Sequence, residues 1–201
     1  MNSTKDFYSS VKSRRSMYSI SSEAILSNEE IVDIVNHAVL HTPSAFNSQN
    51  GRVVVLLGEN HQDLWNITRE VLRKKISEDR FPATDKKLNT FAGGYGTILF
   101  FEDIGIVESL QGKFPSYADR FPIWSHHSIG MLQYIIWTSL EAEGYGASLQ
   151  HYNPIIDEQV KERWNIPQNW SLVAQMPFGK PAGPAGDKEY MPLEDRVKIY
   201  K

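Results

Sequence analysis

Apolar residues recur along the chain with two periods, which predict helices interleaved with short strands. Ser27 and Glu30 form a capping-box signature before an apolar stripe of helical spacing, so we expect a helix that ends before Pro43. Further helices are expected at residues 6–12, 61–77, 129–140 and 153–164. Strands rich in apolar residues are expected at residues 52–57, 97–101, 147–151 and 172–176. Residues 42–51 and 112–122 are expected to form loops, and the charged residues 78–87 a mobile segment.

This order of elements predicts a mixed α+β fold, because no βαβ unit repeats as a doubly wound parallel sheet would require. No repeat or shift in composition divides the chain, so residues 1–201 are expected to form a single domain. The segment 129–140 is apolar on nearly every side, which indicates a central helix covered by other elements. The tail from Lys180 is rich in Pro and Gly, yet it closes on Val197, Ile199 and Tyr200, which a second subunit could bury.

Composition narrows the classes of function. The chain has 41% hydrophobic and 22% charged residues, values typical of a soluble globular protein, and a net charge of −3. A mildly acidic chain lacks the broad positive field that a nucleic acid or an anionic membrane would need. The absence of cysteine excludes disulfides, thiolate metal sites and cysteine nucleophiles. Residues 121–140 carry no Asp, Glu, Lys or Arg, but their histidines and serines favour a protein interior over a membrane, and we expect a cytoplasmic location.

Three local motifs resemble known functional motifs, but each lacks a feature that the function would require. The Gly-Gly-Tyr-Gly motif at residues 93–96 leads into a strand, whereas a dinucleotide fingerprint follows one, so turn glycines are expected. His37 and His41 stand four residues apart without an evident third ligand, so we expect no metal site. The His-His pair at 126–127 lies between two serines, but no Gly-x-Ser-x-Gly elbow accompanies it, and a small hydrolase or binding module is left as a minor alternative.

Two polar clusters are more informative. Arg14, Arg15 and Ser16 place two guanidiniums beside a hydroxyl, a combination that suits a phosphate monoester, although a solvated basic turn explains it equally well. The loop Ser-Ala-Phe-Asn-Ser-Gln at residues 44–49 supplies hydroxyl and amide groups that both donate and accept hydrogen bonds. Such groups fit a polyol or the edge of a heterocycle, and the alternative is a polar loop after a helix.

These pieces occur in an order that resembles the FMN-dependent nitroreductase family. The stretches FPIWSHHSIGMLQYIIW, EGYGASLQHYNP and GYGTILFFED are similar to its short branch, the nitroreductase-like oxidoreductases grouped with fungal fatty-acid-repression proteins. The resemblance extends from about residue 7 to residue 200. It implies a nitroreductase-like fold, in which helices flank a mostly antiparallel central sheet, and an intertwined homodimer with an extended C-terminal tail.

The resemblance also implies a bound FMN and the residues that hold it. The positions that match the phosphate and ribityl contacts are Arg14, Arg15, Ser16 and Lys188. The loop that meets the edge of the flavin ring, from the partner subunit, matches Ser44, Asn47 and Gln49, and the strand end whose backbone N–H lies near flavin N5 matches Gln150 and His151. Tyr18 and Tyr190 stand where many members have a lysine and an arginine, and Lys87 could supply charge near the pyrimidine ring.

The function implied by the resemblance is hydride transfer from NAD(P)H, through flavin N5, to a small nitroaromatic or quinone acceptor. Because the flavin carries the redox chemistry, no catalytic protein nucleophile is expected. We expect Phe46, Trp124 and His127 to contact the acceptor. The departures at Tyr18 and Tyr190 leave a second interpretation open, a non-catalytic or regulatory flavin-binding protein with the same fold.

Overall fold

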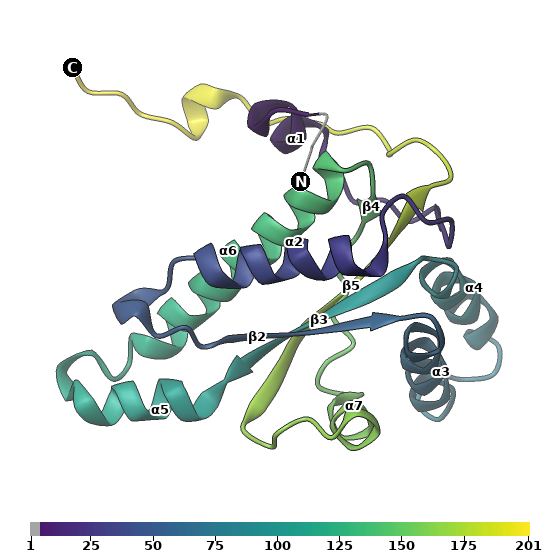
Figure 1. Cartoon of the computed structure of the whole chain (residues 1–201), viewed down its shortest axis with the longest axis horizontal. Coiled ribbons are helices and arrows are strands. Elements are labelled where there is room, and N and C mark those ends of the chain that lie inside the picture. The colour runs from purple at the N-terminus through teal and green to yellow at the C-terminus, as the bar shows by residue number, and fades with distance from the viewer. Residues whose placement is uncertain (1–4) are drawn as a thin grey trace.

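The computed structural model describes residues 5–201, and within them seven α-helices surround one sheet (Figure 1). The helices are α1 (Phe7–Ser13), α2 (Asn28–His41), α3 (Glu59–Arg73), α4 (Phe81–Ala92), α5 (Ile104–Lys113), α6 (Phe121–Ala142) and α7 (Asp157–Trp164). The strands are β1 (Ile20–Ser21), β2 (Gly51–Leu57), β3 (Gly96–Asp103), β4 (Gly146–Ala147) and β5 (Trp170–Pro181). This mixed architecture confirms the predicted fold class.

The sheet is antiparallel at every pairing between its strands. Its order is β1-β5-β3-β2, and β4 pairs with β5 outside that path. The long strand β5 therefore pairs with three strands, β1, β3 and β4. The pairing of β4 with β5 joins Ala147 to Phe178, and this pairing places the segment after β4 along the sheet.

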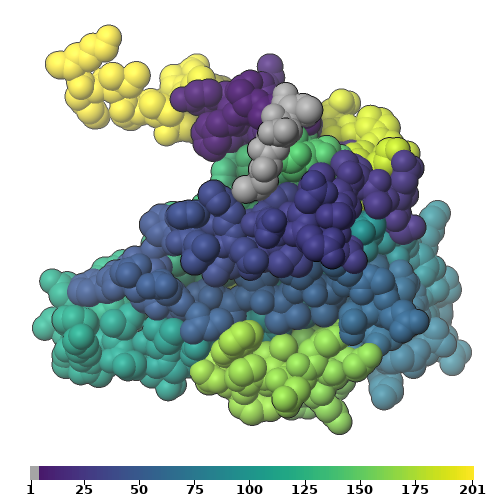
Figure 2. All heavy atoms as spheres, viewed as in Figure 1, coloured from purple at the N-terminus to yellow at the C-terminus, as the bar shows by residue number. Residues whose placement is uncertain are grey.

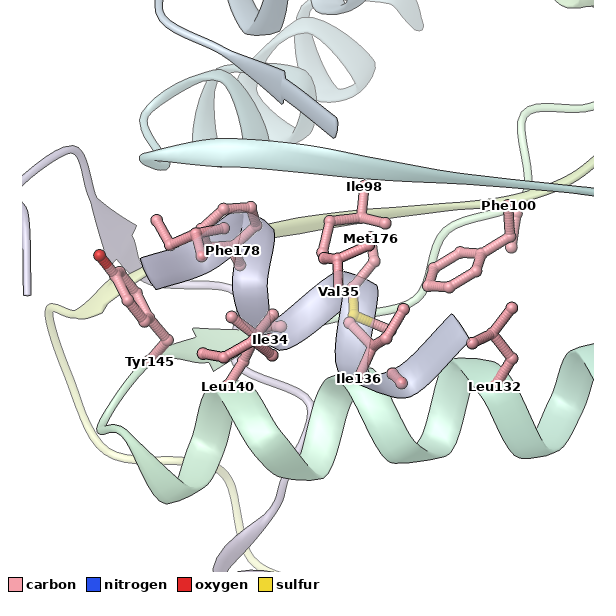
Figure 3. Close-up of a cluster of buried hydrophobic side chains, with 14 of the residues drawn as sticks. Ile34, Val35, Ile98, Phe100, Leu132, Ile136, Leu140, Tyr145, Met176 and Phe178 are labelled. Atoms are coloured by element: carbon pink, nitrogen blue, oxygen red, sulfur yellow. The ribbon is translucent and has the colours of Figure 1, made fainter. Parts of the chain in front are cut away.

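The core lies on both faces of the sheet, because successive side chains of β3 point to opposite sides. Ile98 and Phe100 face α2 and α6, where they pack with Ile34, Ile136 and Met176 (Figure 3). Leu99 and Phe101 face the other way, into a second cluster that contains residues of α3, α4 and α7. All four of these β3 side chains are fully buried, which explains why the strand reads as an unbroken apolar run.

The expectation of a mobile segment at residues 78–87 is wrong beyond Arg80, because α4 begins at Phe81. Proline at the second position of α4 fits the first turn of a helix. Leu88 and Phe91 are fully buried and anchor the helix against the sheet. Arg69 of α3 also binds Asp85 of α4 through an ion pair of 2.6 Å. Only two of the twelve residues of α4 are buried. The sequence therefore shows mostly polar and charged residues here and too few apolar positions to indicate a helix.

Other boundaries also differ from the predicted ones. Helix α5 was not predicted, and α6 begins at Phe121, eight residues before the expected start. Helix α3 ends at Arg73 instead of residue 77. The expected strand at 147–151 is reduced to β4 and an isolated bridge between Gln150 and Gln175. Within residues 5–201, none of the helices combines the length and the apolar run that crossing a membrane requires.

The two ends of the chain leave apolar side chains exposed. The tail after β5 runs along α1 and then stands away from the body of the protein (Figures 1 and 2). Ile199 and Tyr200 are 74% and 93% exposed, and Phe7 and Tyr8 of α1 are also open to solvent. Helix α6 is likewise incompletely covered, since Ile123, Met131 and Tyr134 are exposed. The helix expected at residues 129–140 is therefore covered by other elements on one side and open to solvent at Met131 and Tyr134.

Candidate functional site

The Arg-Arg-Ser motif lies directly beside the segment after α6. Ser16 and Ala147 form a parallel bridge, and the backbone N–H of Met17 donates to the carbonyl oxygen of Ala147 over 2.9 Å. The approach is close at Gly146, where an added Cβ would lie 2.9 Å from Cβ and Cγ of Met17. A glycine at this position therefore lets two motifs that are far apart in the sequence meet.

Arg14 is held on α6 with part of its hydrogen-bonding capacity unused. Its guanidinium carbon lies 4.4 Å from the centre of the Trp137 ring, a cation–π contact. Its Nε is buried and has no hydrogen-bond partner within residues 5–201. A buried donor without a partner costs about 1–3 kcal/mol, so this atom indicates a position where an acceptor fits.

The strand end at residues 148–151 presents backbone donors to its open side. The N–H groups of Ser148 and Gln150 donate to Pro177 and Gln175 of β5. Because donors alternate along extended chain, those of Leu149 and His151 point away from β5, and neither has a partner in the described part of the chain. Of the two residues expected near a ring nitrogen, His151 therefore offers the available N–H. The side chain of Gln150 is buried and donates to the Ser148 hydroxyl over 3.1 Å.

The C-terminal tail reaches the same region. Arg15 donates from Nη2 to the carbonyl oxygen of Gly186, and Lys188 follows two residues later with its ammonium 5.0 Å from the ring of Tyr190. Lys188 is exposed, so its ammonium is free to reach an anion near Arg15. The contact brings the tail segment that carries Lys188 next to Arg15.

Lys87 lies on the exposed face of α4, close to the end of the Arg-Arg-Ser segment. Its ammonium is 5.8 Å from the ring of Phe91, and the ring of Tyr18 lies 6.3 Å from that same ring. Lys87 and Tyr18 therefore both lie near the ring of Phe91, and Tyr18 follows Ser16 by two residues. This arrangement places an exposed cation of α4 near the end of the Arg-Arg-Ser segment.

The loop at residues 44–49 carries unusual backbone conformations. Phe46, Asn47 and Gln49 have φ angles of 56°, 49° and 48°, in the left-handed region that non-glycine residues rarely adopt. The Ser44 hydroxyl closes the loop by accepting from the backbone N–H of Gln49 over 2.9 Å. The side chains of Phe46, Asn47 and Gln49 remain exposed. Backbone strain of this kind concentrates at binding sites, where the surrounding structure enforces it.

An aromatic cluster holds this loop on α6. Phe46 stacks on Trp124 with ring centres 6.1 Å apart and an interplanar angle of 21°. The ring centres of Phe114 and Phe121 lie 4.9 and 5.4 Å from the ring centre of Phe46. His127 is exposed on α6, three residues after Trp124. The structure thus brings Phe46 and Trp124 together and leaves both His127 and the face of Phe46 accessible.

The loop and the Arg-Arg-Ser motif lie at opposite ends of α6 (Figure 1). Phe46 packs on Trp124, whereas Arg14 packs on Trp137, thirteen positions further along. At the rise of an α-helix this separation is about 20 Å. Within one copy of the chain, the loop and the Arg-Arg-Ser motif are therefore too far apart to contact each other.

Known proteins are similar to this chain in sequence and in structure. The sequence model described as the nitroreductase family matches residues 11–180. The chain belongs to the nitroreductase family. HBN1 of Saccharomyces cerevisiae, which is named a nitroreductase, is 33% identical over 202 residues that cover 100% of both chains.

Solved nitroreductase structures have the same fold. The nitroreductase CinD of Lactococcus lactis in complex with chloramphenicol is 39% identical, with a TM-score of 0.90 over 98% of this chain and 100% of CinD. CinD in complex with 4-nitrophenol gives 40% identity and a TM-score of 0.89, with the same coverage. A nitroreductase-fold protein of Exiguobacterium sibiricum in complex with FMN shares the fold at 17% identity, with a TM-score of 0.70 over 99% of each chain.

The nitroreductase fold leaves the hydrolase alternative without support. Ser125 is buried, donates its hydroxyl proton to Glu102 and accepts from Asn50. Ser128 donates to the carbonyl oxygen of Trp124 in its own helix. Within residues 5–201 no hydrogen bond joins either serine to His126 or its neighbour, so the arrangement of a serine nucleophile with a histidine base is not formed.

Sequence reasoning missed a buried histidine in this chain. His61 of α3 is 1% exposed, and its Nε2 lies 3.1 Å from the carbonyl oxygen of Ala92 and its Nδ1 2.8 Å from the Thr97 hydroxyl. The carbonyl oxygen of Ala92 can only accept, so the proton of His61 lies on Nε2 and Nδ1 accepts from the Thr97 hydroxyl. The same hydroxyl accepts from the indole of Trp65. Burial lowers the pKa of His61 to about 4. No local sequence signal separates such a histidine from an exposed one on the same helix.

Proposed function

We propose that this chain binds FMN and works as an NAD(P)H-dependent oxidoreductase that reduces nitroaromatic or quinone acceptors. The observation that carries the proposal is that Arg14, whose buried Nε has no hydrogen-bond partner within residues 5–201, lies two residues before the bridge of Ser16 to Ala147. The strand end after Ala147 has N–H groups that do not pair with β5. An anion and a polar ring edge would satisfy these donors together. A phosphorylated tricyclic ring has both groups in one molecule.

The phosphate end of FMN is assigned to Arg14, Arg15 and Lys188, with Ser16 on the ribityl chain. Hydrogen bonds to charged groups contribute about 1.5–3 kcal/mol each, so two or three of them give roughly 5 kcal/mol. Micromolar affinity requires about 8 kcal/mol. The rest must come from burying the ring, for which the segment at 147–152 offers an extended wall.

The ring end is assigned to the strand end and to α4. The N–H of His151, next to Gln150, would donate to the ring near N5, and Lys87 would hold negative charge near the pyrimidine. Bound FMN supplies hydride transfer, which no side chain of this protein can perform. The protein residues bind and orient the ring and stabilise the charge that it gains.

A homodimer is part of the proposal. Because about 20 Å of α6 separates Trp124 from Trp137, the loop with Ser44, Asn47 and Gln49 would complete the site of a second copy. The exposed apolar residues of α1, α6 and the tail are a surface that such a copy would cover. The single domain and the cytoplasmic location expected from the sequence belong to the same proposal.

The acceptor is expected to stack between the flavin and the aromatic cluster. Phe46 is 53% exposed where it stacks on Trp124, and His127 is exposed on the same helix as Trp124. The complexes of CinD with chloramphenicol and 4-nitrophenol, both nitroaromatic compounds, support this acceptor class.

One experiment tests this function and its rival together. The purified protein should be yellow, release FMN on heating, and oxidise NADH or NADPH steadily when a nitroaromatic or quinone acceptor is present. Bound FMN without turnover would instead favour the non-catalytic flavin-binding protein, which the tyrosines at positions 18 and 190 leave open. A protein that binds no added FMN would contradict both.

A further inference from the structure

A cavity at the end of the proposed ring site contains two ionisable side chains, those of Glu102 and His126, that the proposed function does not use. It has a volume of about 450 Å³, within the range that small aromatic ligands occupy. Its charged and titratable lining residues are Glu102 of β3, His126 of α6 and His151 of the strand end. Gly130 also lines it, and an added Cβ there would meet nothing within 4 Å, so this wall is open.

A chain of directed hydrogen bonds ends on the Glu102 carboxylate. The Ser48 hydroxyl donates to Oδ1 of Asn50 over 2.9 Å, Nδ2 of Asn50 donates to the Ser125 hydroxyl, and Ser125 donates to Oε1 of Glu102. Asn50 and Ser125 are buried, and the Glu102 side chain is 12% exposed. Because every donor points toward Glu102, the network suits an ionised carboxylate and fixes its orientation.

The second oxygen of this carboxylate faces an imidazole. Oε2 of Glu102 lies 4.0 Å from Nε2 of His126, whose side chain is 62% exposed. Nδ1 of His126 has no hydrogen-bond partner in the described part of the chain. A carboxylate beside one ring nitrogen favours the proton on that nitrogen, so the other nitrogen is left to exchange protons with a ligand in the cavity.

We propose that His126 donates, from Nδ1, the proton that a quinone acceptor needs when it is reduced, and that Glu102 is the residue that positions its ring. The proposal rests on the proposed function, in which NAD(P)H-reduced flavin provides the hydride. The quinone gains that hydride and one proton and becomes a hydroquinone. His126 is left neutral with its proton on Nε2, beside Glu102, and regains the Nδ1 proton from water through its exposed edge.

The test compares two acceptors on the reduced holoenzyme in stopped flow. Ferricyanide takes up electrons and no proton, whereas 1,4-benzoquinone requires protons. General acid catalysis contributes about 100- to 10,000-fold, so His126→Gln should slow quinone reduction by at least about 100-fold and leave the ferricyanide rate unchanged. His37→Gln, an exposed histidine of α2, is the matched control and should change neither rate.

A second measurement does not depend on turnover. Nitrogen NMR of the imidazole should show neutral His126 protonated on Nε2 in the parent protein and a mixture of tautomers in Glu102→Gln. Unchanged quinone reduction in His126→Gln, an equal loss with both acceptors, or an unchanged tautomer in Glu102→Gln would overturn the proposal. A parent protein that binds no FMN or is not reduced by NAD(P)H would instead overturn the proposed function on which it rests.

Discussion

Arg15 donates a hydrogen bond to the carbonyl oxygen of Gly186, 171 residues further along the chain. The contact ties the tail to the residue after Arg14, whose buried Nε has no hydrogen-bond partner within residues 5–201. It brings the tail segment that carries Lys188 beside the Arg-Arg-Ser motif. The proposed phosphate site depends on this juxtaposition.

Replacing Arg14 should weaken flavin retention more than it weakens the fold. Loss of a charge-assisted hydrogen bond of about 1.5–3 kcal/mol lowers FMN affinity roughly 10- to 100-fold in Arg14→Ala. Loss of the contact with Trp137 costs the apoprotein about 1 kcal/mol. Removal of the buried Nε, which has no partner within residues 5–201, offsets this by about 1–3 kcal/mol, so the apoprotein should be no less stable than the parent. Fluorescence titration with FMN and denaturant unfolding measure the two effects. Arg80→Ala, at an exposed arginine, is the control, and equal FMN affinity in Arg14→Ala and the parent would refute the phosphate assignment.

The close approach at Gly146 should be intolerant of a methyl group. An alanine Cβ would lie 2.9 Å from the side chain of Met17, so Gly146→Ala is expected to lose about 1–3 kcal/mol of unfolding free energy and to displace Ser16. FMN affinity should fall with it. Gly112→Ala on α5 has open space around its Cβ and should gain about 1 kcal/mol. Denaturant unfolding of both variants checks the difference, which a neutral Gly146→Ala would contradict.

Two substitutions at Gln49, whose backbone is left-handed, distinguish the effect of backbone strain on stability from the effect of the side chain on FMN binding. Gln49→Gly and Gln49→Ala both delete the amide, but only alanine keeps a Cβ at a φ of 48°. The glycine variant should therefore be the more stable of the two by about 1 kcal/mol. Their FMN affinities should fall equally below that of the parent if the amide contacts the ring. Equal unfolding free energies in the two variants would show that the loop relaxes when the side chain is removed.

The buried His61 should make stability fall in mild acid. Its folded pKa of about 4 lies below the ordinary value of 6.5, so the stability it contributes is complete above pH 6.5 and is lost as the pH falls toward 4. Between pH 8 and pH 5 the unfolding free energy should decrease by about 2 kcal/mol from this group. Denaturant unfolding at the two pH values measures the loss. In His61→Gln this part of the pH dependence should disappear, and its persistence would assign the effect to other groups.

The sequence predicted those elements whose signals are local. The capping box of Ser27 and Glu30 is formed, and α2 begins directly after Ser27. Helix α4 was missed because Leu88 and Phe91 are its only buried residues. The motif Arg14–Ser16 could be found by its composition, but its contact with Ala147 depends on the pairing of distant segments. The pairing of Glu102 with His126 joins β3 to α6, so neither residue carries a local signal for it.

The central claim is that cations from both chain ends bind one flavin phosphate. A crystal structure of the protein grown with FMN tests it most directly. The account predicts the phosphate within hydrogen-bond distance of Arg14 or Arg15 and near Lys188, with the ring edge at the N–H of His151. A phosphate bound elsewhere, with Arg14 still unpartnered, would contradict it.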